Sequence, residues 1–121
     1  MASVIDLVAF LKARLDEDEA AANAAWGVEW DWRYIAQPFG ERPSIAHTVH
    51  IARHDPARVL REVEAKRAMI ARYERAAALP ASVVSFTHGQ DDGYAQACAD
   101  AIRDAAAVWS DHPDYRQEWK P

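Results

Sequence analysis

The strongest helix start in the chain lies near its middle, in the segment His50-Ile51-Ala52-Arg53-His54-Asp55-Pro56-Ala57-Arg58-Val59-Leu60-Arg61-Glu62. Asp55 has a short carboxylate side chain that can accept hydrogen bonds from the first unpaired backbone N–H groups of a helix. Pro56 has its φ angle already set for the first helical position, where its missing N–H costs nothing. A helix capped by Asp55 is therefore predicted. Its end is predicted at about Leu79, because Pro80 disfavours helical geometry in the preceding residue.

Two stretches before this helix alternate with a period of two, which is typical of strands. In the first, apolar aromatic or β-branched residues fill every second position: Trp26, Val28, Trp30, Trp32 and Tyr34. In the second, from Ser44 to Ala52, one side holds Ile45, His47, Val49 and Ile51. The proline-rich turn Gln37–Pro43 lies between them, so an antiparallel hairpin is predicted. The backbone is then expected to change from extended to helical at residues 54 to 56.

A hairpin of two strands is only marginally stable alone, so helices are expected to cover its tryptophan face. One helix is predicted from Ser3 to Ala24, opened by a capping box and carrying the apolar stripe Val4, Leu7, Val8, Leu11 and Leu15. Another is predicted to start at Asp91 or Asp92 and to bury Tyr94, Cys98, Ile102, Ala105 and Trp109. The predicted fold is α+β, with three helices packed on a Trp-rich antiparallel β-hairpin, in a single domain of residues 1–121.

The connecting and terminal segments carry two further expectations. Residues 81–92 are predicted to form a linker, whose Val83-Val84-Ser85-Phe86 packs as an apolar loop rather than as a third strand. The C-terminal tail contains Tyr115 and Trp119, which are costly to leave in water. We therefore expect the tail to be held against the rest of the protein.

Charge and cysteine usage narrow the classes of partner and the cellular compartment. The formal net charge of −5 argues against broad binding to nucleic acid, although Arg53, Arg58 and Arg61 could form a local basic patch. The single cysteine, Cys98, excludes an intrachain disulfide, suits a reducing cytosol and is expected to be buried and inert. No apolar run has the length of a membrane span, and no secretory signal is evident. A cytoplasmic protein is predicted.

The polar residues around the predicted helix start form the candidate site. His50, His54 and His112, with Asp55, are residue types that bind metals or transfer protons. Capping by Asp55 competes with that role, and histidines of ordinary surfaces are the simpler interpretation. The helix N-terminus beside Arg53, Arg58 and His54 is a candidate anion site. These arginines are more simply explained by pairing with the acidic residues Asp16, Glu17, Asp18, Glu19, Asp111, Asp114 and Glu118.

The candidate ligand or anion site is thus His50, His54, Arg58 and His112, with Asp55 as a helix cap. The identity of any metal is left open. The sequence gives no reason to expect a cofactor, and no serine or cysteine lies in the setting of a catalytic nucleophile.

Three segments together resemble a known family. These are Leu7–Glu19, His50–Arg67 and the terminal Asp111-His112-Pro113-Asp114-Tyr115-Arg116-Gln117-Glu118-Trp119. They resemble a family of short actinobacterial and actinobacteriophage proteins of unknown function. The resemblance implies a bacterial or phage cytosolic protein and brings no activity, cofactor or catalytic residue.

Two functions of different class remain open. The first is a non-enzymatic protein-interaction module of unknown target, whose partner is another protein or a second copy of the chain. A homodimer would cover the excess aromatic surface of the hairpin. The alternative is a small metal- or anion-dependent enzyme that uses the histidines and arginine of the predicted strand-to-helix junction.

Overall fold

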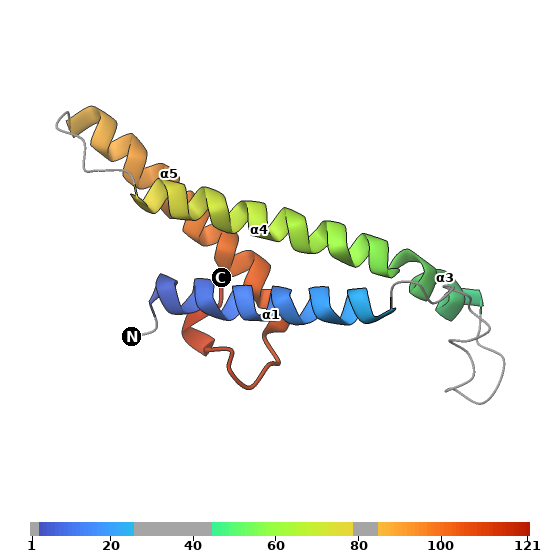
Figure 1. The fold of residues 1–121 in the computed structure, drawn as a ribbon. Coiled ribbons are helices and arrows are strands. Elements are labelled where there is room, and N and C mark those ends of the chain that lie inside the picture. Colours follow the sequence, from blue (N-terminus) through green and yellow to red (C-terminus); the bar gives the residue numbers. More distant parts are fainter. Residues whose placement is uncertain (1–2, 26–44, 79–84) are drawn as a thin grey trace. The chain divides into compact units, whose positions relative to one another are not determined.

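The computed structural model describes residues 3–25, 45–78 and 85–121, and these residues form helices without any β-strand. The four α-helices are α1 (Val4–Ala25), α3 (Ile45–Arg53), α4 (Pro56–Ala78) and α5 (Ser85–Ala106) (Figure 1). Two short 3₁₀ turns follow, η2 (Ala107–Trp109) and η3 (Gln117–Trp119). The described part of the protein is therefore all-α, and the predicted α+β fold is wrong.

The predicted hairpin fails because its second strand is the helix α3. Ile45 and Val49 alternate as in a strand, but they are also four residues apart, and that spacing equally places them on one face of a helix. Neither is buried: Ile45 is 84% exposed and Val49 is 46% exposed. Without a buried face, β-branched side chains gain little from a pleated surface, and local helix formation decides the outcome. The tryptophan-rich stretch Trp26–Tyr34, its turn Gln37–Pro43 and the predicted indole face lie outside the described residues.

The second correction concerns the start of the last helix. α5 begins at Ser85, inside the segment predicted to be a linker, instead of at Asp91 or Asp92. Asp91 and Asp92, the predicted caps, both lie inside α5, and so does Gly93. A glycine inside a helix costs about 1 kcal/mol, which neighbouring helical turns can outweigh. The rest of the predicted apolar loop, residues 83 and 84, lies outside the described residues.

Two of the predicted helices are confirmed closely. α1 begins with the reciprocal contacts of a capping box: the Asp6 N–H donates to Ser3 Oγ at 3.1 Å, and the Ser3 N–H lies 3.4 Å from Asp6 Oδ2. α4 begins at Pro56 and ends at Ala78, as the Asp55-Pro56 start and the proline at position 80 predicted. Both helices therefore follow from local sequence signals.

The described chain divides into two compact units, each considered by itself. The first unit comprises Met1–Leu15 and Ala65–Pro121, and the second comprises Asp16–Glu64. The core of the first unit contains side chains from α1, α4, α5 and the tail, all less than a tenth exposed: Leu7, Val8, Phe10, Leu11, Leu15, Ile70, Ala76, Ala99, Ile102, Ala106, Tyr115 and Trp119. The apolar stripe predicted for the first helix is thus largely buried.

The buried face of α5 differs in part from the predicted one. Ile102 is fully buried, but Tyr94 is 53% exposed, and Cys98 is only half-buried. Ala105 and Trp109 are half-buried as well. The burial of the helix is concentrated in its second half, which is the half that precedes the tail.

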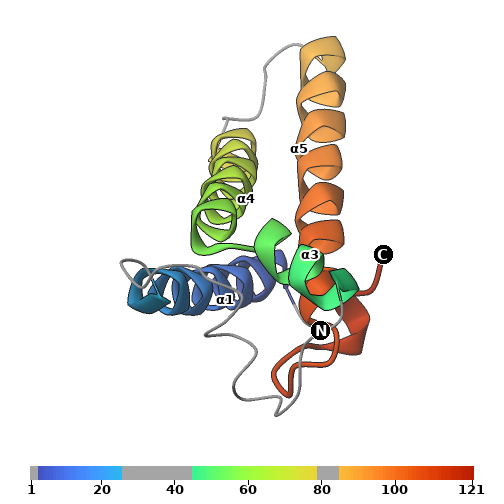
Figure 2. The same ribbon diagram turned by 90° about the vertical axis from the view of Figure 1, so that its right-hand side faces the viewer.

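The C-terminal tail is held in place, as predicted. It turns back after η2 and does not continue the axis of α5 (Figure 2). Trp119 is 4% exposed and Tyr115 is 6% exposed. The ring of Phe10 on α1 lies 5.9 Å from the Tyr115 ring and 5.2 Å from the Trp119 ring, between centroids. These are edge or tilted aromatic contacts, which add to the burial of apolar area.

The second unit contains the last part of α1, the whole of α3 and the first part of α4. Ala22, Pro56 and Val63 are its buried apolar residues within the described chain. No residue of α3 is buried. The prediction of a single domain over residues 1–121 stays a prediction.

The helices of the described residues also bear on membrane association. None of them combines sufficient length with sufficient hydropathy to cross a bilayer.

Gly93 provides a test of the α5 assignment. It lies exposed within the helix, and a Cβ atom built on it would meet nothing within 4 Å. Gly93→Ala is therefore expected to raise the free energy of unfolding by about 0.5–1 kcal/mol, because alanine loses less conformational entropy on folding. Urea denaturation measures the change.

The matched control is the reverse substitution on the same helix, at the exposed residue Ala97. Ala97→Gly should lower stability by a similar amount. A Gly93→Ala protein less stable than the original would show that this position is not in a helix interior.

Candidate functional site

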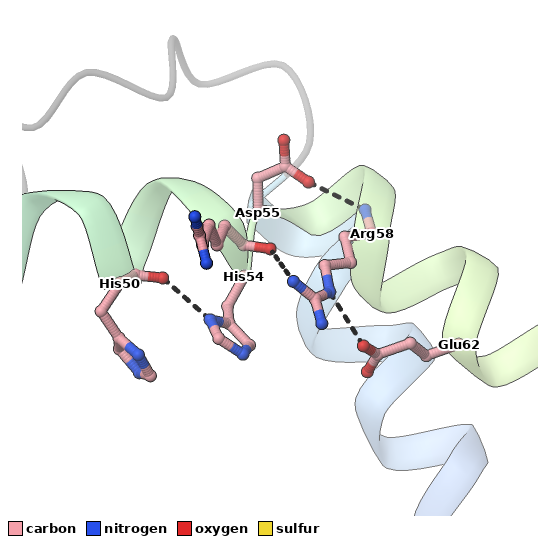
Figure 3. A network of polar contacts seen from close by, with 6 residues as sticks. His50, His54, Asp55, Arg58 and Glu62 are labelled. Carbon is pink, nitrogen blue, oxygen red and sulfur yellow. Dashed lines mark hydrogen bonds and ion pairs between the residues drawn. The ribbon is translucent and has the colours of Figure 1, made fainter.

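The candidate site lies at the corner between α3 and α4, where His54 and Asp55 connect the two helices. The His54 N–H donates to the Ile51 carbonyl at 3.1 Å, which closes the last turn of α3. The Arg58 N–H then donates to Asp55 Oδ1 at 2.8 Å (Figure 3), and the Val59 N–H donates to the Asp55 carbonyl at 3.1 Å. Asp55 is thus the N-cap of α4, and that prediction is confirmed.

Arg58 joins the two helices at this corner. Its Nη1 donates to the carbonyl of Arg53, the last residue of α3, at 3.0 Å, and its Nε donates to Glu62 Oε1 at 3.0 Å. A cation at the C-terminal end of α3 also interacts favourably with the helix dipole. Arg58 and Glu62 have side chains 43% and 44% exposed, so the ion pair itself adds little stability. The value of Arg58 lies in satisfying the Arg53 carbonyl.

Glu62 precedes Lys66 by four residues, a spacing that favours an ion pair on a helix, but the structure pairs Glu62 with Arg58. The Lys66 ammonium instead lies 5.1 Å from the centroid of the Trp109 ring, in a cation–π contact within the first unit.

His50 and His54 form a pair of exposed imidazoles on the same side of the corner. Their ring centroids are 4.4 Å apart and the rings are tilted by 36°. His54 Nδ1 donates to the His50 carbonyl at 2.8 Å. Because Nδ1 carries the proton in that bond, Nε2 of a neutral His54 presents its lone pair. In Figure 3 both rings point away from the side of the chain on which Asp55 lies.

His112 lies in the first unit, in the tail segment, and has a different environment. Its Nδ1 accepts the N–H of Asp114 at 3.0 Å, so this nitrogen carries no proton. Arg14 Nη1 lies 2.9 Å from the same Nδ1 and also contacts Nε2. The ring packs edge-on against Phe10, with 5.5 Å between centroids. His112 therefore helps to hold the tail on α1.

Arg14 is a polar residue that the sequence analysis did not single out. It is only 8% exposed, with its guanidinium carbon 5.2 Å from the Phe10 ring centroid. A signal for this was present, because Arg14 follows Phe10 by four residues and Leu7 by seven, which places all three on one helix face. A long arginine stem can pack in such an apolar stripe.

The structure thus brings together His50, His54, Asp55 and Arg58, while His112 belongs to the other unit. In residues 3–25, 45–78 and 85–121, no three histidine, cysteine, aspartate or glutamate side chains converge to hold a metal ion. At this corner, the predicted ligand site therefore consists of His50 and His54. Asp55 is engaged as the helix cap, and Arg58 is engaged with the Arg53 carbonyl and Glu62.

A second feature of functional interest is a groove in the first unit, with a volume of about 570 Å³. It runs between the first turns of α1 and the last turns of α4. The Lys12–Glu74 ion pair, with 2.7 Å between Nζ and Oε1, crosses from one helix to the other. Its lining is mostly apolar: Ile5, Val8, Ala9, Lys12, Tyr73, Glu74, Ala77 and Ala78. No sequence signal identified this groove, because it depends on two segments some sixty residues apart.

The cap at Asp55 gives a direct prediction for the corner. Asp55→Ala is expected to lower the free energy of unfolding by about 1 kcal/mol, because the Arg58 N–H loses its acceptor. Chemical denaturation measures the change. The control is Asp104→Ala, an exposed position inside α5, where the same substitution should be neutral or slightly stabilising. Equal losses in both variants would contradict the capping role.

Comparison with known proteins places the chain in a family without assigning it an activity. No curated protein and no solved structure matches the chain significantly. One family model, described as a family of unknown function, matches residues 4–121 and so covers nearly all of the chain. The protein therefore belongs to the family of unknown function DUF6221.

Proposed function

We propose that this protein is a non-enzymatic protein-interaction module that binds a second copy of itself through the groove of the first unit. The observation that carries the proposal is the open apolar groove between α1 and α4, with Ile5 at its edge. Ile5 is 77% exposed, although it is one of the most hydrophobic residues of the chain. Exposed apolar surface of this kind is typical of contact sites.

The shape of the groove suits a helix as its occupant. On α1 the lining residues Ile5, Val8, Ala9 and Lys12 follow the spacing of a single helix face. On α4 the opposite wall ends in Ala77 and Ala78, whose small side chains permit close approach of another backbone. A helix from a partner can therefore pack along the groove between the two walls.

A second copy of the chain offers such a helix, because α1 carries both a projecting side chain and part of a hollow. In a two-fold contact, Ile5 of each copy would enter the groove of the other copy. Such a contact uses the same patch on both subunits, so the patch must be complementary to itself. Ile5 and the hollow beside Ala77 meet that requirement.

The charges at the groove are also self-complementary. Lys12 and Glu74 carry opposite charges on the two walls, with side chains 53% and 48% exposed. A two-fold axis through the patch would bring Lys12 of one copy towards Glu74 of the second copy. Complementary charges at the edge of an interface favour the correct orientation more than they add affinity.

A non-enzymatic role is supported by the way the polar residues of the α3–α4 corner are used. Asp55 caps α4 through a hydrogen bond to the Arg58 N–H, and Arg58 bonds the Arg53 carbonyl and Glu62. These contacts stabilise the chain's own turn. The metal- or anion-dependent enzyme was the alternative from the sequence, and it would need these groups for a substrate.

The cellular setting of the module is part of the proposal. The single cysteine and the sequence resemblance favour a bacterial or phage protein that acts in the cytoplasm. The acidic net charge favours a protein over a nucleic acid as the partner.

Ile5→Asp tests the proposed contact. The side chain is exposed, so the substitution should leave the helical content by circular dichroism unchanged. It would place a carboxylate in an apolar interface. We therefore expect the dissociation constant of the dimer to rise more than about tenfold. Sedimentation equilibrium over a range of concentrations measures this.

The matched control for that experiment is Val108→Asp. Val108 is 66% exposed, apolar and in the same unit, but it does not line the groove. The control should dimerise like the original protein. A protein that is strictly monomeric at all concentrations, or equal effects of both substitutions, would overturn the proposal.

Charge reversal tests the orientation of the dimer. A Lys12→Glu chain has two acidic residues at the groove and a Glu74→Lys chain has two basic residues. Each variant should therefore repel itself. In an equal mixture the two should form heterodimers, because both contacts across the two-fold axis regain opposite charges.

Native mass spectrometry of the mixture, with one of the two variants uniformly labelled with ¹⁵N, distinguishes heterodimers from homodimers by mass. A statistical mixture of homodimers and heterodimers would contradict the assigned orientation. Failure of the Ile5→Asp experiment would contradict the contact itself, so the two results are separable.

A further inference from the structure

We propose that His50 and His54 form a two-nitrogen clip for a divalent transition-metal ion, with Zn²⁺, Ni²⁺ and Cu²⁺ as the class of ion bound. The proposal concerns the second unit and is independent of the dimer groove. It rests on the spacing of the two rings, on the hydrogen bond that orients one of them, and on their exposure.

The spacing suits chelation. His50 lies in the last turn of α3 and His54 directly follows the end of that helix, so the two are four residues apart, with 4.4 Å between their ring centroids. Two histidines at this spacing on one side of a helix can bind the same metal ion. The sequence analysis placed a strand at Ser44–Ala52, whereas the structure has the helix α3 there, with His54 at its end.

The hydrogen bond of His54 prepares it as a ligand. Its Nδ1 donates to the His50 carbonyl at 2.8 Å, which fixes the ring orientation and leaves the lone pair on Nε2. Histidines that bind metals commonly donate their other N–H to a backbone carbonyl in this way. Within the described part of the chain, the nitrogens of His50 make no hydrogen bond, so a small rotation of this exposed ring is inexpensive.

Two arginines stand near the histidine pair in the chain, Arg53 immediately before His54 and Arg58 in the first turn of α4. The charge of Arg58 is offset by Glu62, with 3.0 Å between Nε and Oε1. The Asp55 carboxylate lies on the other side of the chain and accepts the Arg58 N–H, so it is not counted as a ligand.

Two imidazoles leave the remaining coordination positions of the ion to water or to an incoming ligand. This arrangement is weaker than a closed structural site with four protein ligands. Imidazole nitrogen suits zinc, copper and nickel, whereas Mg²⁺ and Ca²⁺ prefer oxygen ligands. We therefore expect the histidine pair to bind Zn²⁺, Cu²⁺ and Ni²⁺ but not Mg²⁺ or Ca²⁺.

The test is isothermal titration calorimetry of the full chain with Ni²⁺ and with Zn²⁺, using Mg²⁺ as a negative probe. One ion per chain is expected. His50→Ala and His54→Ala should each weaken binding by more than about tenfold, since removing a ligand should cost at least as much as removing its orienting partner. Both side chains are exposed, so circular dichroism should show unchanged helical content.

The control is His47→Ala, which removes an exposed histidine from the same helix outside the pair. It should bind the ions like the original protein. Absence of Ni²⁺ and Zn²⁺ binding by the original chain would overturn the proposal. A loss in the His47→Ala variant as large as in the other two would also overturn it, because the pair would then have no special role.

Discussion

The aromatic contact between α1 and the C-terminal tail is the interaction on which the first unit depends. Phe10 contacts Tyr115, Trp119 and His112, and Trp119 lies 5.6 Å from Tyr115 between ring centroids. Burying the rings of Phe10, Tyr115 and Trp119 contributes on the order of 2 kcal/mol each. This gain outweighs the cost of the Tyr115 hydroxyl and the Trp119 N–H, which have no hydrogen-bond partner within the described residues. Both ends of the chain are thereby held in one unit, and α1 gains a fixed surface.

The α3–α4 corner shows a different use of polar side chains. Asp55 and Arg58 satisfy backbone groups that the end of one helix and the start of the next would leave open. Their role in the turn leaves the two histidines as the polar groups that face outward with ligand capacity. A single corner therefore serves as a structural joint and as a candidate ligand site, with different residues in each role.

The error at residues 45–53 has a physical explanation. The pair Ile45 and Val49 fits a strand and a helix almost equally well, since residues four apart share a face in both. Burial normally decides between them, and no residue of α3 is buried. At the site, Asp55 was predictable from local chemistry, whereas the contacts of Arg58 and the depth of Arg14 were not, because each depends on a neighbouring turn or on the tail.

The sequence by itself determined the start of α4, the extent of α1, the burial of the tail aromatics and membership of a family without known activity. These depend on capping, on helical periodicity and on the high cost of exposing large rings, all of which act locally or through hydrophobicity. Only the tertiary structure decided that Lys12 lies beside Glu74, that Ile5 borders a groove, and that the His50 and His54 rings lie together at the end of α3. These features arise from the packing of distant segments, or from a choice between strand and helix that local preference leaves nearly balanced.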